Sequence, residues 1–265
     1  GRASAGDGRK KRAGPASVAV TGAAGYVGRQ VVATLAADRR SLKTIVAMDV
    51  RKVRKKDRLE GVEYVTADVR SKDLADIFKR NGVDTVVHLA SIVTPGKGMT
   101  EDFLYSVDVL GTHNVLEACV AAGVTDLVVT SSGAAYGYHA DNPEWLSETS
   151  PIRGNKEFAY SNHKRIVEED PARYRQEHPE LRQLIFRPGT ILGESVSNQI
   201  TALFEKPVVL GLRGAASPWV FIWDQDVVNC IVIGVHERRE GIYNLAGDGV
   251  MTMRDIAARI RKPYL

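Results

Sequence analysis

The stretch VTGAAGYVGRQ, residues 20–30, spaces three glycines at intervals of three: Gly22, Gly25 and Gly28. A short apolar run precedes them, and apolar residues at helical spacing follow them. Between a strand and a helix, the first glycine permits a tight turn and the second lets the backbone approach a pyrophosphate. The third lets the helix pack closely on the sheet. The free N–H groups at the helix N-terminus favour an anion, so the stretch predicts a dinucleotide-phosphate site.

An acidic residue supports the same prediction. Asp49 ends the next apolar run, KTIVAMD, about 20 residues after Gly28, where a carboxylate accepts hydrogen bonds from ribose hydroxyls. The alternative is a glycine-rich turn followed by an unrelated aspartate. Strand, glycines, helix and acid in this order favour dinucleotide binding. Tyr26 and Val27, which lie between the second and third glycines, are included among the predicted cofactor contacts.

Strand-like and helix-like segments alternate along most of the chain. The runs IVAM, TVVHL and LVVT are continuously apolar, as expected of parallel strands that are covered by helices on both faces. Short links join these segments, which predicts an α/β fold with a doubly wound parallel sheet. A long helix is expected from Tyr160 to about residue 178, kinked or restarted at Pro171 because proline removes a helical hydrogen bond.

The chain divides into three predicted parts. Residues 1–17 carry five basic residues against one acidic residue, which accounts for the net charge of +4, and they are expected to form a disordered basic tail. Residues 18–188 are predicted to form the dinucleotide-binding domain with the catalytic residues. Residues 189–265, where the pattern loosens, are predicted to form a small substrate-binding region that is truncated at its C-terminus.

The composition argues against several classes of protein. Cys119 and Cys230 lie far apart in apolar segments, which favours reduced thiols and a cytoplasmic location over a disulfide. No apolar run approaches the roughly 18 residues of a membrane helix. We therefore expect no membrane association. The six histidines are scattered without metal-ligand spacing, so we also expect no metal site. Nucleic-acid binding through the tail is the less favoured interpretation of its charge.

The motifs taken together resemble the extended branch of the short-chain dehydrogenase/reductase superfamily, the NAD-dependent epimerase/dehydratase family. The resemblance covers residues 20 to about 250 and implies a Rossmann fold, NAD as cofactor and a small-molecule substrate. It rests on TGAAGYVG, Asp49, ADV at 67–69, HLAS at 88–91, GTHNVLEA at 111–118, TSSGAAYG at 130–137, YSNHK at 160–164 and RPG at 187–189.

The resemblance assigns roles to particular residues. Tyr160 takes the acid/base role, and Lys164, one helical turn later, favours its phenolate and contacts the nicotinamide ribose. Ser132 matches the residue that hydrogen-bonds the reacting oxygen, with Ser131 as the fallback. The remaining cofactor contacts that the resemblance implies are Asp68 and Val69 beside adenine, Leu89, Ala90 and Ser91 beside ribose and phosphates, and Pro188 by the nicotinamide. His88 is expected to be structural.

Two departures bear on the substrate. Asp108 stands where the family usually has asparagine, and Trp219 stands where nucleotide-sugar members place a basic residue for the diphosphate; Arg213 is a possible substitute. The favoured hypothesis is an NAD-dependent oxidoreductase or epimerase that acts on a hydroxyl or ketone carbon. A nucleotide-sugar epimerase or dehydratase is the alternative, and a catalytically silent dinucleotide-binding sensor is an alternative of another class.

The resemblance also implies a homodimer, in which the helix at 101–122 pairs with the catalytic helix. Alanines, valines and Leu116 on that helix supply apolar surface, although they are equally compatible with burial inside one chain. The cofactor is expected to be NAD in preference to NADP, because Asp49 would repel a 2′-phosphate. Arg51, Lys52 and Arg54, in a loop expected to be mobile, are the opposing influence.

Overall fold

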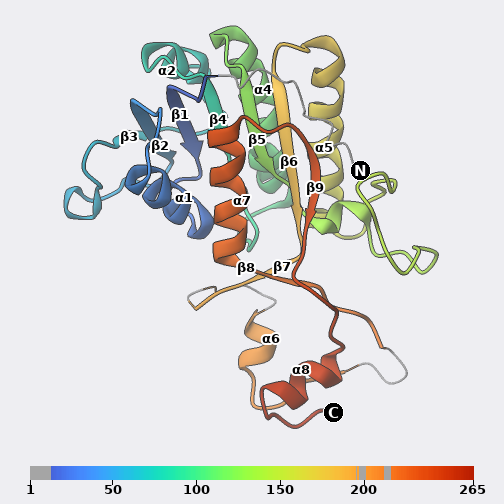
Figure 1. Cartoon of the computed structure of the whole chain (residues 1–265). Helices are drawn as coiled ribbons and strands as arrows, with labels where there is room; N and C mark the ends of the chain where they lie inside the picture. The colour runs from blue at the N-terminus through green and yellow to red at the C-terminus, as the bar shows by residue number, and fades with distance from the viewer. Residues whose placement is uncertain (1–12, 195, 197–200, 212–215) are drawn as a thin grey trace, which may run out of the picture.

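A seven-stranded, all-parallel sheet forms the centre of the molecule (Figure 1), in a computed structural model whose described residues are 13–194, 196, 201–211 and 216–265. The strand order is β3-β2-β1-β4-β5-β6-β9. Strands β2 and β3 are added on one side of β1 and the later strands on the other side, as in a doubly wound sheet. The strands are β1 (Ser17–Thr21), β2 (Thr44–Asp49), β3 (Glu63–Thr66), β4 (Thr85–His88), β5 (Asp126–Thr130), β6 (Arg182–Pro188) and β9 (Gly241–Leu245). The predicted fold class is therefore confirmed.

Helices cover both faces of this sheet. Along β1, Val18 and Val20 join a buried cluster with α1 (Tyr26–Ala37) and α7 (Asp224–Glu237), while Ala19 joins a second cluster on the opposite face. That second cluster contains residues of α2 (Leu74–Arg80), α4 (Gly111–Ala122) and α5 (Ala159–Glu177). This arrangement explains the continuously apolar strands, because consecutive side chains point into different cores.

The helix predicted at 101–122 is continuous but changes its winding. It begins with α3 (Glu101–Tyr105), continues through a π-helical turn at Ser106–Leu110 and then becomes α4. Thr100 caps its start by accepting a hydrogen bond from the Phe103 amide. The π-helical turn contains Asp108, which faces the interior of the molecule. Wide turns of this kind are frequent at functional sites.

Helix α5 is one element, with Pro171 inside it and no restart. The proline is buried. The helix continues through Pro171 without a break, so the restart that we considered from the sequence does not occur. The consequence for the site is that Tyr160 and Lys164 lie in the first two turns of a helix that continues to Glu177.

A small lobe hangs from the carboxyl edge of the sheet (Figure 1). It contains α6 (Thr201–Glu205) and α8 (Met253–Arg259), and the short parallel pair β7 (Thr190–Leu192) and β8 (Phe221–Trp223) connects it to the sheet. The lobe is formed by two segments of the chain, one before α7 and one after β9. Between them, α7 and β9 belong to the main body, where β9 pairs with β6. Two elements of the region predicted as substrate-binding, α7 and β9, thus belong to the central sheet layers.

The N-terminal segment also differs from its predicted boundary. Strand β1 begins at Ser17, and the Ala13 carbonyl before it accepts a hydrogen bond from Arg238 Nε. The described chain is therefore tied to the core from residue 13, whereas the predicted tail extended to residue 17. Residues 1–12 of that tail, and Arg213, lie outside the described residues.

Candidate functional site

The glycine-rich turn has the conformation that its sequence predicts. Gly22 adopts a φ of +68°, and a Cβ atom there would lie 2.7 Å from the Ala90 amide nitrogen. A Cβ on Gly28 would lie 2.1 Å from the Gly22 carbonyl oxygen, so only glycine lets α1 pack on the turn. Gly25 is the N-cap residue of α1 and leaves the first helical amides available to an anion. These features fit a dinucleotide pyrophosphate.

Asp49 braces this turn from the end of β2. Its Oδ2 accepts a hydrogen bond from the Ala24 amide at 2.9 Å, and its Oδ1 accepts from the Arg51 amide at 2.9 Å. The Arg51 guanidinium forms an ion pair with the same carboxylate at 3.1 Å. Arg51 therefore lies directly on Asp49, and Arg54 is paired with Asp57. Both arginines of the loop that we expected to be mobile thus have an acidic partner in the structure.

The remaining predicted cofactor residues lie at the carboxyl ends of β3, β4 and β6. Arg70 holds Asp68 in an ion pair at 2.6 Å and, mainly through its side-chain hydrogen bonds, lowers the pKa of that carboxyl group. Val69 is buried against α4, where a Cβ on Gly111 would lie 2.7 Å from its Cγ2. Leu89, Ala90 and Ser91 follow β4, and Pro188 ends β6.

The predicted catalytic residues come from two elements. Ser132 follows β5 and caps the short 3-10 helix at Gly133–Tyr136, since its Oγ accepts a hydrogen bond from the Ala134 amide at 3.1 Å. Ser131, the fallback, is instead buried and donates to Glu168 Oε1 at 2.6 Å. The geometry therefore favours Ser132 as the serine available to a substrate.

Lys164 is the most constrained member of the set. Its side chain is buried, with 4% of the residue exposed, and its ammonium donates a hydrogen bond to Ser91 Oγ at 3.2 Å. The same Nζ lies 5.6 Å from the centre of the Tyr160 ring. The structure thus brings Tyr160 and Lys164 together with Ser91, which we predicted to contact the cofactor. Ser91 and Lys164 are 73 residues apart in the sequence.

A cavity of about 10 Å³ lies behind this lysine, between β4, β5 and the π-helical turn. Asp108 lines it together with Lys164 and Ser91, and its Oδ1 accepts a hydrogen bond from the Ile92 amide at 2.9 Å. Its other oxygen lies 3.9 Å from Nδ1 of the buried His163. Asp108 therefore braces the loop that follows β4 and also places a buried carboxyl group in the cavity that Lys164 lines.

His88 is structural in the way the sequence suggested. Its Nδ1 lies 2.8 Å from Thr21 Oγ1, and its Nε2 lies 2.9 Å from Thr112 Oγ1. Because Thr112 donates its own proton to the Asp108 carbonyl, it accepts from His88, so the neutral ring carries its proton on Nε2. Burial, with a smaller contribution from Lys164, lowers the pKa of His88 to about 3.

Two contacts at the site were not predicted. Arg187 of β6 and Glu168 of α5 form a buried ion pair that also holds Ser131, and the Arg187 guanidinium donates to the Tyr136 hydroxyl at 2.9 Å. The second contact joins Tyr26 to Asp224 at the start of α7. An arginine inside the apolar run LIFRP is the signal that could have revealed the first pair, since a buried charge requires a partner.

Several expected absences can be stated only for the described part of the chain. Within it, no group of three or more His, Cys, Asp or Glu side chains is arranged to hold a metal ion. Within the same residues no helix is long and apolar enough to cross a membrane. Both cysteines are free thiols, and burial raises the pKa of Cys119.

The comparison with protein families decides the identity of this fold. The sequence profile of the NAD dependent epimerase/dehydratase family matches residues 18–246. The chain belongs to this family. This confirms the family predicted from the motifs, together with the enzyme class and NAD as the family's cofactor.

Individual relatives in this family differ in what their names describe. An uncharacterized protein of Mycobacterium tuberculosis is 23% identical over 248 residues, which are 92% of this chain and 66% of that protein. An L-arabinose 1-dehydrogenase (NAD(P)(+)) of Haloferax volcanii is 38% identical over 144 residues, 52% of this chain and 51% of that enzyme. The chain therefore spans about half to two thirds of the length of these curated relatives.

Among solved structures, the UDP-glucose 4-epimerase of Thermus thermophilus in complex with NAD is similar with a TM-score of 0.77 and 25% identity. The alignment covers 94% of this chain and 85% of that enzyme. A dTDP-glucose 4,6-dehydratase from Bacillus anthracis, also in complex with NAD, has a TM-score of 0.74 at 18% identity, which establishes a shared fold. Proteins with this fold thus include an epimerase and a dehydratase.

Proposed function

We propose that the chain is an NAD-dependent oxidoreductase or epimerase that transfers a hydride between nicotinamide and a hydroxyl or ketone carbon of a small molecule. When bound, NAD supplies the hydride acceptor or donor. The observation that carries the proposal is the buried Lys164 ammonium, which lies between Ser91 Oγ at 3.2 Å and the Tyr160 ring at 5.6 Å. A buried ammonium is expensive unless it serves charged partners. The Asp108 carboxyl group in the same cavity is one such partner, and a tyrosine that must lose its proton is another.

The chain's own residues divide the work of the reaction. Tyr160 takes the hydroxyl proton of an alcohol substrate, or gives a proton to the oxygen of a ketone. Lys164 favours the phenolate by its charge, because an opposite charge at close range stabilises the ionised form. Ser132 holds the reacting oxygen. We assign the cofactor's phosphates to the turn at Gly22–Gly28 and its adenosine ribose to Asp49.

The substitution Tyr160→Phe tests this assignment. It removes the proton-transfer group and keeps the ring, so turnover should fall by at least about a hundredfold while NAD affinity is retained. The matched control is Tyr243→Phe, an exposed tyrosine on β9. Turnover of Tyr160→Phe within threefold of the unaltered enzyme would refute the acid/base role, and it would favour a dinucleotide-binding sensor.

A nucleotide-sugar epimerase or dehydratase is the second candidate, and the similarity to the Thermus thermophilus epimerase supports it. The two candidates differ in how the cofactor is used, since an epimerase returns the hydride that it removes. Mass spectrometry of the purified protein separates them. Tightly retained NAD would favour hydride return, and a readily lost cofactor would favour net oxidation or reduction.

The assembly and location of the protein belong to the same proposal. We propose a homodimer in which the helix at 101–122 pairs with the catalytic helix α5. Phe103 and Tyr105 of α3 and Leu110 of the π-helical turn are exposed apolar residues on the first of these helices. Leu116, which was considered for this surface, is instead fully buried within the chain. The reduced thiols support a cytoplasmic location. Light scattering at micromolar concentration tests the dimer, and a monomer there would refute it.

A further inference from the structure

Three aromatic rings form a row that ends at Tyr160. The Tyr138 and Phe158 rings lie 6.1 Å apart between centres and are tilted by 36°, and the Phe158 and Tyr160 rings lie 6.1 Å apart and are tilted by 42°. Phe158 is the residue that caps the start of α5, two positions before Tyr160. Tyr138 comes from the loop after the 3-10 helix. The row thus joins two elements on the substrate side of the proposed acid/base.

The outer two rings are open to solvent. Tyr138 is 69% exposed and Phe158 is 46% exposed, although both lie beside a chemically important residue. Phe158 lies between Tyr138 and Tyr160, since each of those rings lies 6.1 Å from it. Contiguous exposed apolar surface is a feature of ligand-binding grooves.

The backbone holds these rings in place before any ligand arrives. The Tyr138 amide donates to Asn155 Oδ1 at 2.6 Å, and the Asn155 amide donates to Ser161 Oγ at 3.0 Å within α5. Gly137 adopts a φ of +81°, where a Cβ would lie 2.6 Å from the Gly154 carbonyl oxygen. A preformed surface loses little conformational entropy when a ligand binds.

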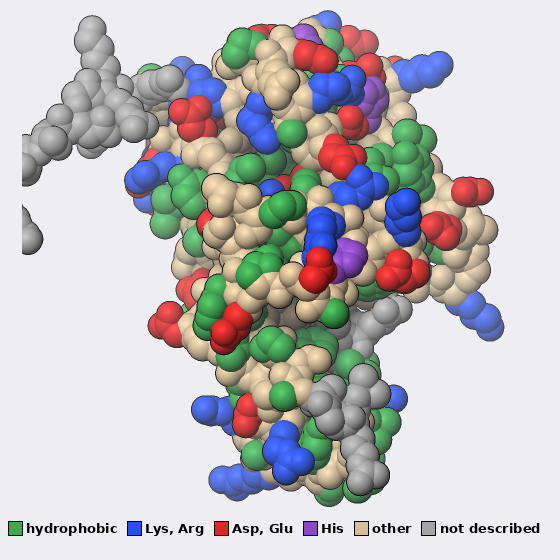
Figure 2. All heavy atoms as spheres, turned by 90° about the vertical axis from the view of Figure 1, so that its right-hand side faces the viewer, with side chains coloured by type: hydrophobic (Ala, Val, Ile, Leu, Met, Phe, Trp, Pro, Cys, Tyr) green, Lys and Arg blue, Asp and Glu red, His purple; other side chains and the backbone are tan. Residues whose placement is uncertain are grey.

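Arg153, a charged residue of the same loop, is already paired. The guanidinium of Arg153 donates to both oxygens of Asp141 at 2.9 Å and also to Asn142. It is therefore committed to the loop and is poorly placed to serve a diphosphate. Figure 2 views the side of the molecule that carries α5, where the body narrows before it widens into the small lobe.

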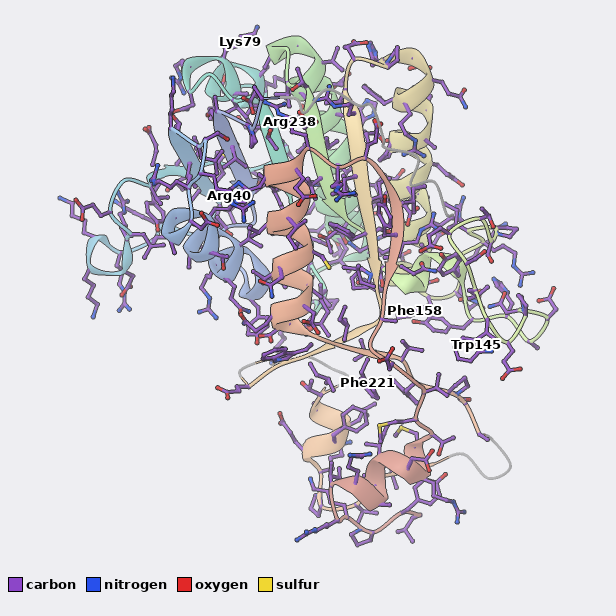
Figure 3. All side chains as sticks on the ribbon, viewed as in Figure 1. Arg40, Lys79, Trp145, Phe158, Phe221 and Arg238 are labelled. Carbon is purple, nitrogen blue, oxygen red and sulfur yellow. The ribbon has the colours of Figure 1, made fainter. Side chains whose placement is uncertain are left out.

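The small lobe presents further aromatic side chains. Trp219 and Phe221 stack at 6.3 Å with an angle of 11°, and Phe204 meets both rings edge-on. In Figure 3, Phe158 lies on the body side of the narrowing and Phe221 on the lobe side. Trp219, at the position where a cation was sought for a diphosphate, belongs to this aromatic cluster. Both sides of the narrowing thus carry aromatic rings.

We propose that the substrate is an alcohol or ketone carried on an extended, apolar ring system, and that Tyr138 and Phe158 form the surface on which those rings lie. This inference rests on the proposed function, because it places the reacting oxygen at Tyr160. The row contains two successive distances of 6.1 Å between ring centres, and it is longer than a single sugar ring. Stacking and edge contacts with aromatic side chains favour flat apolar ligands.

Equilibrium dialysis of acetonaphthone against the full chain saturated with NAD tests the surface without turnover, because this ketone cannot be reduced by the oxidised cofactor. Affinity should fall about tenfold in Phe158→Ala and in Tyr138→Ala, and it should be unchanged in Tyr243→Ala, another exposed aromatic residue. Neither acetone nor UDP-glucose should displace the probe. NAD affinity and the oligomeric state should remain as in the unaltered protein.

Equal affinity in Phe158→Ala and the unaltered protein, or displacement of the probe by UDP-glucose, would overturn the proposal. A change of oligomeric state in the two variants would also overturn it and would assign the rings to a second copy of the chain. Tyr160→Phe separates this result from the proposed function. If that variant keeps both probe binding and oxidation of naphthylethanol, the acid/base role fails while the binding surface stands.

Discussion

Removing one partner of the buried ion pair between α5 and β6 should destabilise the whole domain. The Glu168 side chain is 2% exposed and the Arg187 side chain is 4% exposed. Arg187 Nε donates to both carboxylate oxygens at 2.9 Å, and Ser131 donates to one of them at 2.6 Å. In Glu168→Gln the guanidinium stays buried without an anion, and the new amide nitrogen faces other donors.

The expected magnitude follows from this burial. Breaking a buried pair by removing one charge costs about 3–5 kcal/mol, because the remaining charge is left without compensation. For a chain of this size, each kcal/mol lowers Tm by roughly 2–4 °C, so Tm should fall by about 6–20 °C. The double variant Glu168→Met/Arg187→Met removes both charges and should recover much of that loss.

Thermal unfolding followed by circular dichroism, with urea unfolding for the free energy, measures the effect. The adjacent residue supplies the control: Glu169 pairs with Arg165 one helical turn away, but its side chain is 53% exposed. Glu169→Gln should cost less than about 1 kcal/mol. If Glu168→Gln is no more destabilised than Glu169→Gln, the buried pair does not hold the two elements together and the reasoning is wrong.

Three further outcomes are expected. Asp49→Ala should narrow or reverse a preference for NAD over NADP of at least about tenfold, because two unit charges at about 4 Å repel by roughly 4 kcal/mol; equal affinities in the unaltered protein, measured by titration calorimetry, would mean that Arg51 outweighs Asp49. Because the pKa of His88 is lowered to about 3, the unfolded chain binds more protons below pH 6.5. Its stability should therefore fall by up to about 3 kcal/mol between pH 6.5 and 4, and less in His88→Asn than in the control His178→Gln. Gly28→Ala should cost about 1–3 kcal/mol and weaken NAD binding, since its Cβ would lie 2.1 Å from the Gly22 carbonyl oxygen; unchanged NAD affinity would contradict the role of that glycine.

The sheet and the cofactor turn could be predicted from the sequence because local patterns determine them. Apolar runs, glycine spacing and the strand-end Asp49 each depend on residues within one strand–turn–helix unit. The proximity of Tyr160 and Lys164 could also be predicted, since one helical turn separates them. The domain boundary predicted at residue 188 excluded α7 and β9 from the sheet domain. Their place in it becomes clear only from the pairing of β9 with β6.

Contacts between distant segments could not be predicted in the same way. The approach of Lys164 to Ser91, the pairing of Arg187 with Glu168 and the position of His163 beside Asp108 all depend on tertiary packing. The aromatic row had no periodic signature either, because its rings come from a loop, a helix cap and a helix. Single side chains in irregular segments acquire meaning only when the fold brings them together.

The pairing of β6 with β9 keeps the lobe separate from the hydrogen-bonded strands of the sheet. The lobe is inserted after β6 and again after β9, yet these strands pair over five residues, from Leu184 with Gly241 to Pro188 with Leu245. Insertions or replacements in the lobe therefore leave the register of the sheet intact. A change in the lobe thus alters what stands beside the carboxyl edge of the sheet without altering the strands that carry the proposed catalytic and cofactor residues.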